Sequence, residues 1–104
     1  MILEQFMKLI KSRRSIRRFT DDPVDRNDLI MLIEAALWAP SAGNIHATEY
    51  IIVDEATVLK RMLPFITGVW SKPTAIICIC LDKDREQKKV DIEHWLRYGL
   101  MDIA

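Results

Sequence analysis

Apolar residues recur at helical spacing over much of the chain. Plotted as a helix, residues 2–10 place their apolar side chains on one face and their charged side chains on the rest of the surface. This pattern predicts an amphipathic helix of about ten residues that ends near Ser12. Residues 55–66 predict a further helix, and the pattern from residue 92 to Ala104 predicts a last helical segment. The apolar residues of that last segment are expected to be covered by a partner subunit or by a further part of the domain.

One predicted helix is apolar on almost every side. Residues 29–39 carry a single charged side chain, Glu34, so this helix is expected to be buried. Asp25 precedes it as an N-cap, Asp28 stands at the capping-box position, and Pro40 ends it. Glu34 is expected either to pair with an arginine of the preceding segment or to reach solvent.

Two apolar runs rich in β-branched residues predict strands, Tyr50–Val53 and Ala75–Leu81, and the charged residues Asp82–Lys89 predict a surface turn after the second. Cys78 and Cys80 lie two apart in the second run, so they share a face and are badly placed to bridge each other. They are expected to be reduced thiols that pack in the core rather than a redox pair.

The segment between the first two helices is strongly basic. Residues 13–18 read Arg-Arg-Ser-Ile-Arg-Arg, and in an extended backbone Arg13, Ser15 and Arg17 would share one face. Two guanidinium groups beside a hydroxyl form a suitable receptor for a phosphate or a polyanionic ring edge. The alternative is a solvated basic loop whose charges pair with the nearby acidic residues Asp21, Asp22 and Asp25.

A loop of small residues follows the apolar helix and leads into the first strand. It reads Pro40, Ser41, Ala42, Gly43 and Asn44. Small side chains let a ligand approach the backbone, and the amide of Asn44 can both donate to and accept from a heterocycle edge. The alternative is an ordinary helix stop and turn, since these are the usual turn residues.

Composition narrows the functional classes. The 104 residues carry 15 basic and 15 acidic side chains, so a general nucleic-acid binder is not expected. No apolar stretch is long enough for a membrane helix, and a cytoplasmic protein of one domain, residues 1–104, is expected. His46 and His94 do not complete a metal-site spacing, and no metal is expected. Trp38 and Trp70 are expected in the core or at an interface.

The order of the basic segment and the small-residue loop resembles one protein family. The stretch R-R-S-I-R-R-F, an acidic turn with Pro23, a helix ending L-W-A-P-S-A-G-N and a strand E-Y-I-I-V are similar to the amino-terminal half of FMN-dependent nitroreductases. The resemblance is strongest from Lys11 to Val53. It implies an α+β fold, nitroreductase-like and incomplete in this chain, with helices around a small, mostly antiparallel sheet.

The resemblance also implies which residues bind the cofactor. Arg13, Ser15 and Arg17, with Arg14 beside them, would hold the phosphate, ribityl chain and pyrimidine edge of FMN. The loop would cover the isoalloxazine from the other subunit of a homodimer, through Pro40, Ser41, Ala42 and Asn44. Family members often have Gln-Pro-Trp after that asparagine, where this sequence has His46, Ala47 and Thr48. His46 is expected to contact the flavin.

The implied reaction is ping-pong. NADH or NADPH would reduce FMN, and the reduced flavin would pass electrons to a nitroaromatic, a quinone or a similar acceptor. The flavin supplies this chemistry, so no side chain is expected to act as catalytic acid, base or nucleophile. The alternative is a module of the same fold that binds flavin or nucleotide and dimerises without turnover.

Overall fold

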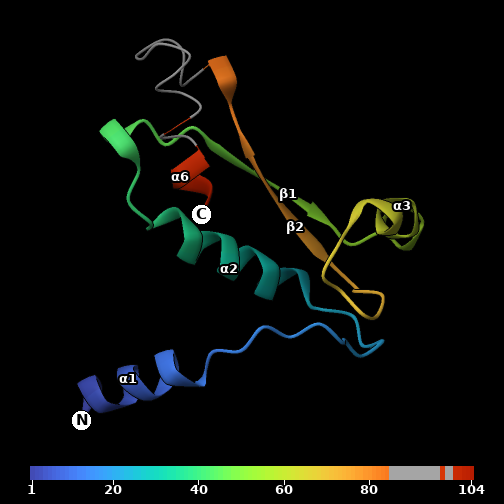
Figure 1. Ribbon diagram of the computed structural model, residues 1–104, viewed down its shortest axis with the longest axis horizontal. Helices are drawn as coiled ribbons and strands as arrows, with labels where there is room; N and C mark the ends of the chain where they lie inside the picture. The colour runs from blue at the N-terminus through green and yellow to red at the C-terminus, as the bar shows by residue number, and fades with distance from the viewer. Residues whose placement is uncertain (85–96, 98–99) are drawn as a thin grey trace.

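The computed structural model describes residues 1–84, 97 and 100–104 (Figure 1). In chain order the elements are α1 (Ile2–Ser12), α2 (Arg26–Leu37), η1 (Ala42–Asn44), β1 (Thr48–Val53), α3 (Ala56–Met62), η2 (Leu63–Phe65), β2 (Ile76–Leu81) and α6 (Leu100–Ile103). Helices and one small sheet alternate along the chain, as the α+β expectation required.

β1 and β2 form an antiparallel pair whose register runs from Thr48 opposite Leu81 to Val53 opposite Ile76. Both predicted strands are confirmed, although β1 begins two residues earlier than its β-branched run because Thr48 already has a ladder partner. Cys78 and Cys80 are free thiols, half-buried on β2 with the more exposed Ile79 between them, as the alternation of a strand requires.

α2 begins where its cap predicts. The Asp25 carboxylate accepts a 2.7 Å hydrogen bond from the backbone N–H of Asn27, which satisfies one of the free donors of the first turn. The cap bond therefore reaches Asn27, and Asp28 contributes only a negative charge near the helix start. The helix ends at Leu37, and Pro40 follows two residues after its C-cap, Trp38.

The expectation of a buried second helix is wrong for this chain. Only Leu29 of α2 is buried, and the large apolar side chains left exposed are Ile30, Met31, Leu32, Leu37 and Trp38. A helix is buried only on the sides where other elements pack, and within the described residues that cover is complete at Leu29 and partial at Ile33 and Ala36. Glu34 is exposed, and no ion pair joins it to an arginine of the described ranges.

The tightly packed core is small. Leu29, Ala47 and Leu59 are the buried hydrophobic residues of the described chain, with 4 %, 0 % and 2 % of their surface exposed. Trp38 and Trp70 are 85 % and 69 % exposed, so the expectation that they are core residues is wrong, while a place at an interface stays a prediction.

The third predicted helix is confirmed but shorter than its pattern. α3 ends at Met62 and continues as the 3₁₀ turn η2, because Pro64 has no N–H to extend the α-helical ladder. Leu59 on α3 is one of the three buried apolar residues.

The two ends of the chain are helical, as expected. α1 stands apart from the sheet and from α2 (Figure 1), and every one of its residues is exposed, so its apolar side chains are uncovered. α6 confirms a helical end, whereas Ile92, Trp95 and Leu96 lie outside the described residues. Of the expected turn at Asp82–Lys89, Lys83 and Asp84 are helical and the remainder is outside the described part. No helix among the described residues is long and apolar enough to cross a membrane.

Candidate functional site

The basic segment is tied to the loop that precedes β2. The backbone N–H of Trp70 donates to the carbonyl of Arg17 at 2.7 Å, and the backbone N–H of Phe19 donates to Ser71 Oγ at 2.6 Å. Farther along, Thr74 Oγ1 donates to the carbonyl of Asp22 at 3.0 Å. These bonds fix an extended backbone alongside residues 68–74, although all of residues 13–20 are exposed.

Arg13 and Ser15 lie together. Arg13 Nη1 donates to Ser15 Oγ at 3.3 Å, so a guanidinium and a hydroxyl share one side of the backbone, as the extended alternation predicts. Arg14 folds back instead, because its Nη1 donates to the carbonyls of Lys11 and Arg13 at 2.8 Å each and so satisfies a free acceptor at the end of α1.

Arg17 is held by a different partner. Its Nη1 donates to the carbonyl of Gly68 at 2.8 Å, and the neighbouring Arg18 lies over the ring of Trp70 with its Cζ 5.6 Å from the centroid. Arg17 is therefore directed toward Gly68 rather than toward Ser15. Its other N–H donors are not used by that bond, because a guanidinium carries five.

The arginines of the basic segment do not pair with the nearby acids. Among the described residues the one ion pair that uses an arginine is Arg26 with Asp54, with Nη2 2.7 Å from Oδ1. This hydrogen bond, and then the charge of Asp54, raise the pKa of Arg26. The contacts described for Arg13, Arg14 and Arg17 are all to neutral oxygens. The alternative that these arginines pair with Asp21, Asp22 and Asp25 is therefore wrong, and no acidic side chain of the described residues forms an ion pair with them.

The loop after α2 has an unusual backbone. Gly43, Asn44 and His46 have φ values of 62°, 56° and 51°, in the left-handed region. Asparagine enters that region more readily than most residues, but for His46 it costs on the order of 1 kcal/mol. Such a conformation persists only when its surroundings hold it.

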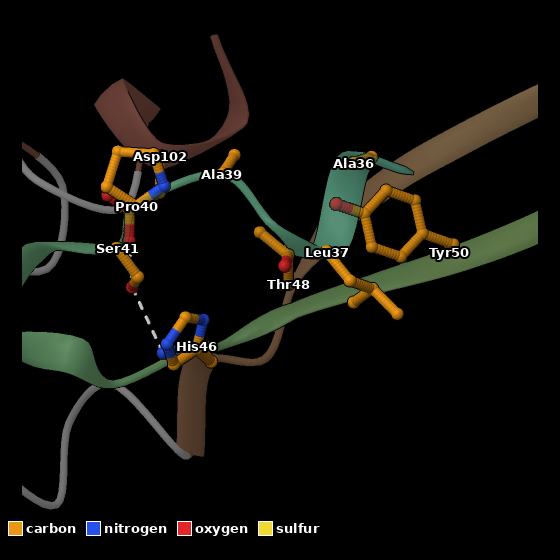
Figure 2. Close-up of a pocket in the computed structure, with 9 residues that line it drawn as sticks. All are labelled: Ala36, Leu37, Ala39, Pro40, Ser41, His46, Thr48, Tyr50 and Asp102. Carbon is orange, nitrogen blue, oxygen red and sulfur yellow. Dashed lines mark hydrogen bonds between the residues drawn. The ribbon is translucent and has the colours of Figure 1, made fainter. Parts of the chain in front are cut away.

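Asp102 of α6 forms the side-chain hydrogen bonds that stabilise this loop conformation. Its Oδ2 accepts from the hydroxyl of Ser41 at 2.7 Å, and its Oδ1 accepts from the backbone N–H of Ala42 at 3.0 Å. The Ser41 oxygen in turn accepts from the backbone N–H of His46 at 3.0 Å, the bond dashed in Figure 2. Ser41, Ala42 and Asp102 are half-buried, so little water competes for these bonds.

Two polar side chains of this loop are accessible to solvent. Asn44 and His46 are exposed, and His46 Nε2 lies 2.5 Å from Asn44 Oδ1. Behind the loop is a cavity of about 20 Å³, enough for about one water molecule. Figure 2 shows its lining, contributed by α2, the loop, β1 and α6: Ala36, Leu37, Ala39, Pro40, Ser41, His46, Thr48, Tyr50 and Asp102.

The structure brings the expected site residues into two groups, not one. The expected phosphate-binding residues lie on the segment before α2, which runs below that helix in Figure 1, whereas the residues Pro40 to His46 follow the end of α2. The first group is Arg13, Arg14, Ser15 and Arg17. Asp102 was not among the expected site residues, because a contact 61 positions away in sequence leaves no local pattern. Gly68 was missed for the same reason. No group of three His, Cys, Asp or Glu within the described ranges is placed to hold a metal ion.

Residues 10–90 match the profile of the nitroreductase family, which is most of the chain and includes the whole basic segment and the loop. The chain belongs to the nitroreductase family. A relative from Archaeoglobus fulgidus, assigned as NADH dehydrogenase/NAD(P)H nitroreductase, is 32 % identical over 91 % of this chain and 55 % of its own length. An NADH dehydrogenase from Thermus thermophilus is 30 % identical over 85 % of this chain and 43 % of its own.

Solved structures agree with this nitroreductase assignment. A crystal structure assigned as a nitroreductase of Bacillus subtilis superimposes with a TM-score of 0.71 at 26 % identity, over 98 % of this chain and 50 % of that one. One assigned as an NADH oxidase of Clostridium acetobutylicum gives 0.70 at 26 % identity, over 91 % and 58 %. The chain thus has part of the nitroreductase fold and spans about half the length of the relatives it matches.

Proposed function

We propose that this nitroreductase-family chain binds FMN and transfers electrons from NADH or NADPH to a small acceptor such as a nitroaromatic or a quinone. The observation that carries the proposal is that Arg13 and Arg17 are exposed and form no ion pair within the described residues, with the hydroxyl of Ser15 beside Arg13. The names of the relatives, which mention NADH dehydrogenase and NAD(P)H nitroreductase, support the electron donor.

The basic segment suits the phosphate end of FMN. A phosphate dianion needs cationic donors that are not already neutralised, and the arginines meet only neutral oxygens among the described residues. Arg13 offers a planar fork, Ser15 a hydroxyl and Arg17 its remaining N–H groups. Because the guanidinium of Arg14 is bonded to two carbonyls, Arg14 would contribute its backbone N–H and its remaining donors.

The loop suits the ring end of the cofactor. Ala42 and Gly43 keep the approach to the backbone open, and the polar groups of Asn44 and His46 are exposed. Pro40 and Ser41 would border the ring from the helix side. These residues would orient the ring and exclude water from it, and no side chain is assigned as a catalytic acid, base or nucleophile.

A homodimer accounts for the separation of the two groups. Within one chain the basic segment runs below α2 and the loop follows the end of that helix (Figure 1), so a second copy is proposed to bring its loop to the FMN held by the first. The uncovered apolar side chains of α1 and α2 are candidates for the surface between the copies. The bound flavin would supply the hydride acceptor, and the two free thiols fit a reducing, cytoplasmic setting.

The direct test is titration of the purified chain with FMN, followed by the quenching of flavin fluorescence. Arg13→Gln is expected to weaken binding about tenfold or more, because it removes a charge-assisted bond to the phosphate. Arg61→Gln, on the exposed surface of α3, is the matched control and should leave the affinity within about twofold. Riboflavin, which lacks the phosphate, should bind wild type and Arg13→Gln alike. Equal FMN affinity for wild type and Arg13→Gln would remove the phosphate role.

A further inference from the structure

We infer that Asp102 is a positioning residue that holds the Ser41–His46 loop, through the Ser41 hydroxyl, in the shape that receives the flavin ring. The role of the loop in receiving the flavin rests on the proposed function. The hydrogen bonds from the loop to Asp102 do not depend on it. Asp102 touches Ser41 and Ala42, and it is not proposed to touch the cofactor.

The hydroxyl of Ser41 donates toward Asp102. A hydroxyl has one proton and two lone pairs, and it rotates toward the best acceptor available. The Ser41 hydroxyl donates its hydrogen bond to the Asp102 carboxylate oxygen, 2.7 Å away. Its proton therefore points away from His46, and a lone pair of Ser41 Oγ accepts from the backbone N–H of His46, 3.0 Å away. The carboxylate therefore acts at His46 without contacting it.

These bonds constrain the backbone of the Ser41–His46 loop. Asp102 holds the N–H of Ala42 directly and the N–H of His46 through Ser41, so it fixes both sides of the left-handed residues Gly43 and Asn44. His46 itself has a φ of 51°, a value that a histidine keeps only when it is held there. Without Asp102 the loop keeps the backbone bond from the N–H of Asn44 to the carbonyl of Ser41 but loses both side-chain bonds that tie it to α6.

The loop backbone also sets the positions of the exposed side chains of Asn44 and His46. The contact between His46 Nε2 and Asn44 Oδ1 depends on the backbone of both residues. Once the loop relaxes, the Asn44 amide no longer has a fixed direction, and the cofactor must order it on binding. Asp102 thus links α6 to the ring-binding side of the site (Figure 2).

The test compares Asp102→Ala and Asp102→Asn with Glu34→Gln, an isosteric change of an exposed acid elsewhere. The first readout is amide hydrogen exchange of Ala42 and His46 in the full chain without FMN. Asp102→Ala should speed exchange at both amides about tenfold or more, because both lose their hold. Asp102→Asn keeps an amide oxygen for Ala42 but presents NH₂ to the Ser41 oxygen, where it competes with the N–H of His46. It should therefore speed exchange at His46 more than at Ala42.

The second readout is FMN affinity by fluorescence titration. Asp102→Ala is expected to weaken FMN binding about tenfold, with Asp102→Asn between it and wild type and Glu34→Gln unchanged. Unaltered exchange at Ala42 and His46 in both Asp102 variants overturns the inference, as does equal loss of both amides in Asp102→Asn. Should Asp102→Ala not fold, the split between the two amides in Asp102→Asn still decides. Failure of the proposed function shows separately, as wild-type protein that does not bind FMN.

Discussion

Arg17 lies directly against Gly68, both through a hydrogen bond and through close packing. The guanidinium Nη1 donates to the Gly68 carbonyl at 2.8 Å, and a Cβ built on Gly68 would lie 3.0 Å from that same nitrogen. Gly68 also has a φ of 80°, a conformation that side chains rarely adopt. The absence of a side chain at position 68 therefore lets the basic segment pack against the loop before β2.

Gly68→Ala is expected to destabilise the chain by on the order of 1 kcal/mol from the positive φ alone, and to displace Arg17 as well. Urea unfolding followed by circular dichroism measures the first effect, and FMN titration the second. Thr67→Ala, at the exposed neighbouring position, is the control and should change neither. An unchanged midpoint for Gly68→Ala would show that the loop adjusts freely and does not position Arg17.

Because the core is small, neighbouring side chains are expected to contribute unequally to the free energy of unfolding. Leu59 is 2 % exposed and its neighbour Val58 is 38 % exposed. Leu59→Ala is expected to lower the free energy of unfolding by about 2–5 kcal/mol, and Val58→Ala by less than about 1 kcal/mol. Chemical unfolding of both variants measures the contrast. Similar losses for both would mean that the packing around α3 differs from that described.

Arg26 and Asp54 join the start of α2 to the residue after β1, with Arg26 bonded through both Nε and Nη2. The raised pKa of Arg26 means that its contribution to stability is complete below the ordinary pKa of arginine and is lost only as the pH rises through the raised value. Arg26→Gln should lower the melting temperature, at most by a few degrees because the pair is exposed, and equally at neutral and mildly alkaline pH.

Arg61→Gln is the control for that experiment, since Arg61 is exposed and has no described ion pair. Its melting temperature should match that of wild type at both pH values. A deficit of Arg26→Gln that disappears at mildly alkaline pH would contradict the assigned role of the guanidinium.

The apolar side of α1 gives a test of self-association. Phe6 and Leu9 are 56 % and 68 % exposed, and exposed apolar surface of this kind commonly marks an interface. If it lies between two copies, Phe6→Gln with Leu9→Gln should raise the dimer dissociation constant at least about tenfold by sedimentation equilibrium. Lys8→Gln on the same helix is the control. An undiminished dimer in the double variant would place the interface elsewhere.

Local features of the fold could be predicted from sequence, because their causes are local. The cap at Asp25, the stop at Pro40 and the strands on either side of α3 each depend on residues only a few positions apart. Burial of α2 could not be predicted in the same way. An apolar pattern shows which surface tends to be covered, whereas the cover comes from elements distant in sequence.

In the candidate site, too, contacts between residues close in sequence could be predicted and contacts between distant residues could not. The extended spacing correctly predicts that Arg13 and Ser15 meet, since they are two residues apart. The bond of Arg17 to Gly68 spans 51 positions and that of Ser41 to Asp102 spans 61, so neither leaves a periodicity or a motif in the sequence. Resemblance to the nitroreductase family supplied the proposed roles of both segments, and geometry added the residues that hold them in place.

The central claim is that this chain holds FMN and reduces it with NADH or NADPH. It is tested most directly by the visible absorption spectrum of the purified protein with bound FMN, recorded without oxygen before and after NADH and then NADPH. The account predicts a protein-bound flavin band that bleaches with at least one of the two donors and returns when a quinone is added. A bound flavin band that neither donor bleaches would contradict it and identify a binding module without turnover, and protein that retains no FMN would contradict the cofactor site itself.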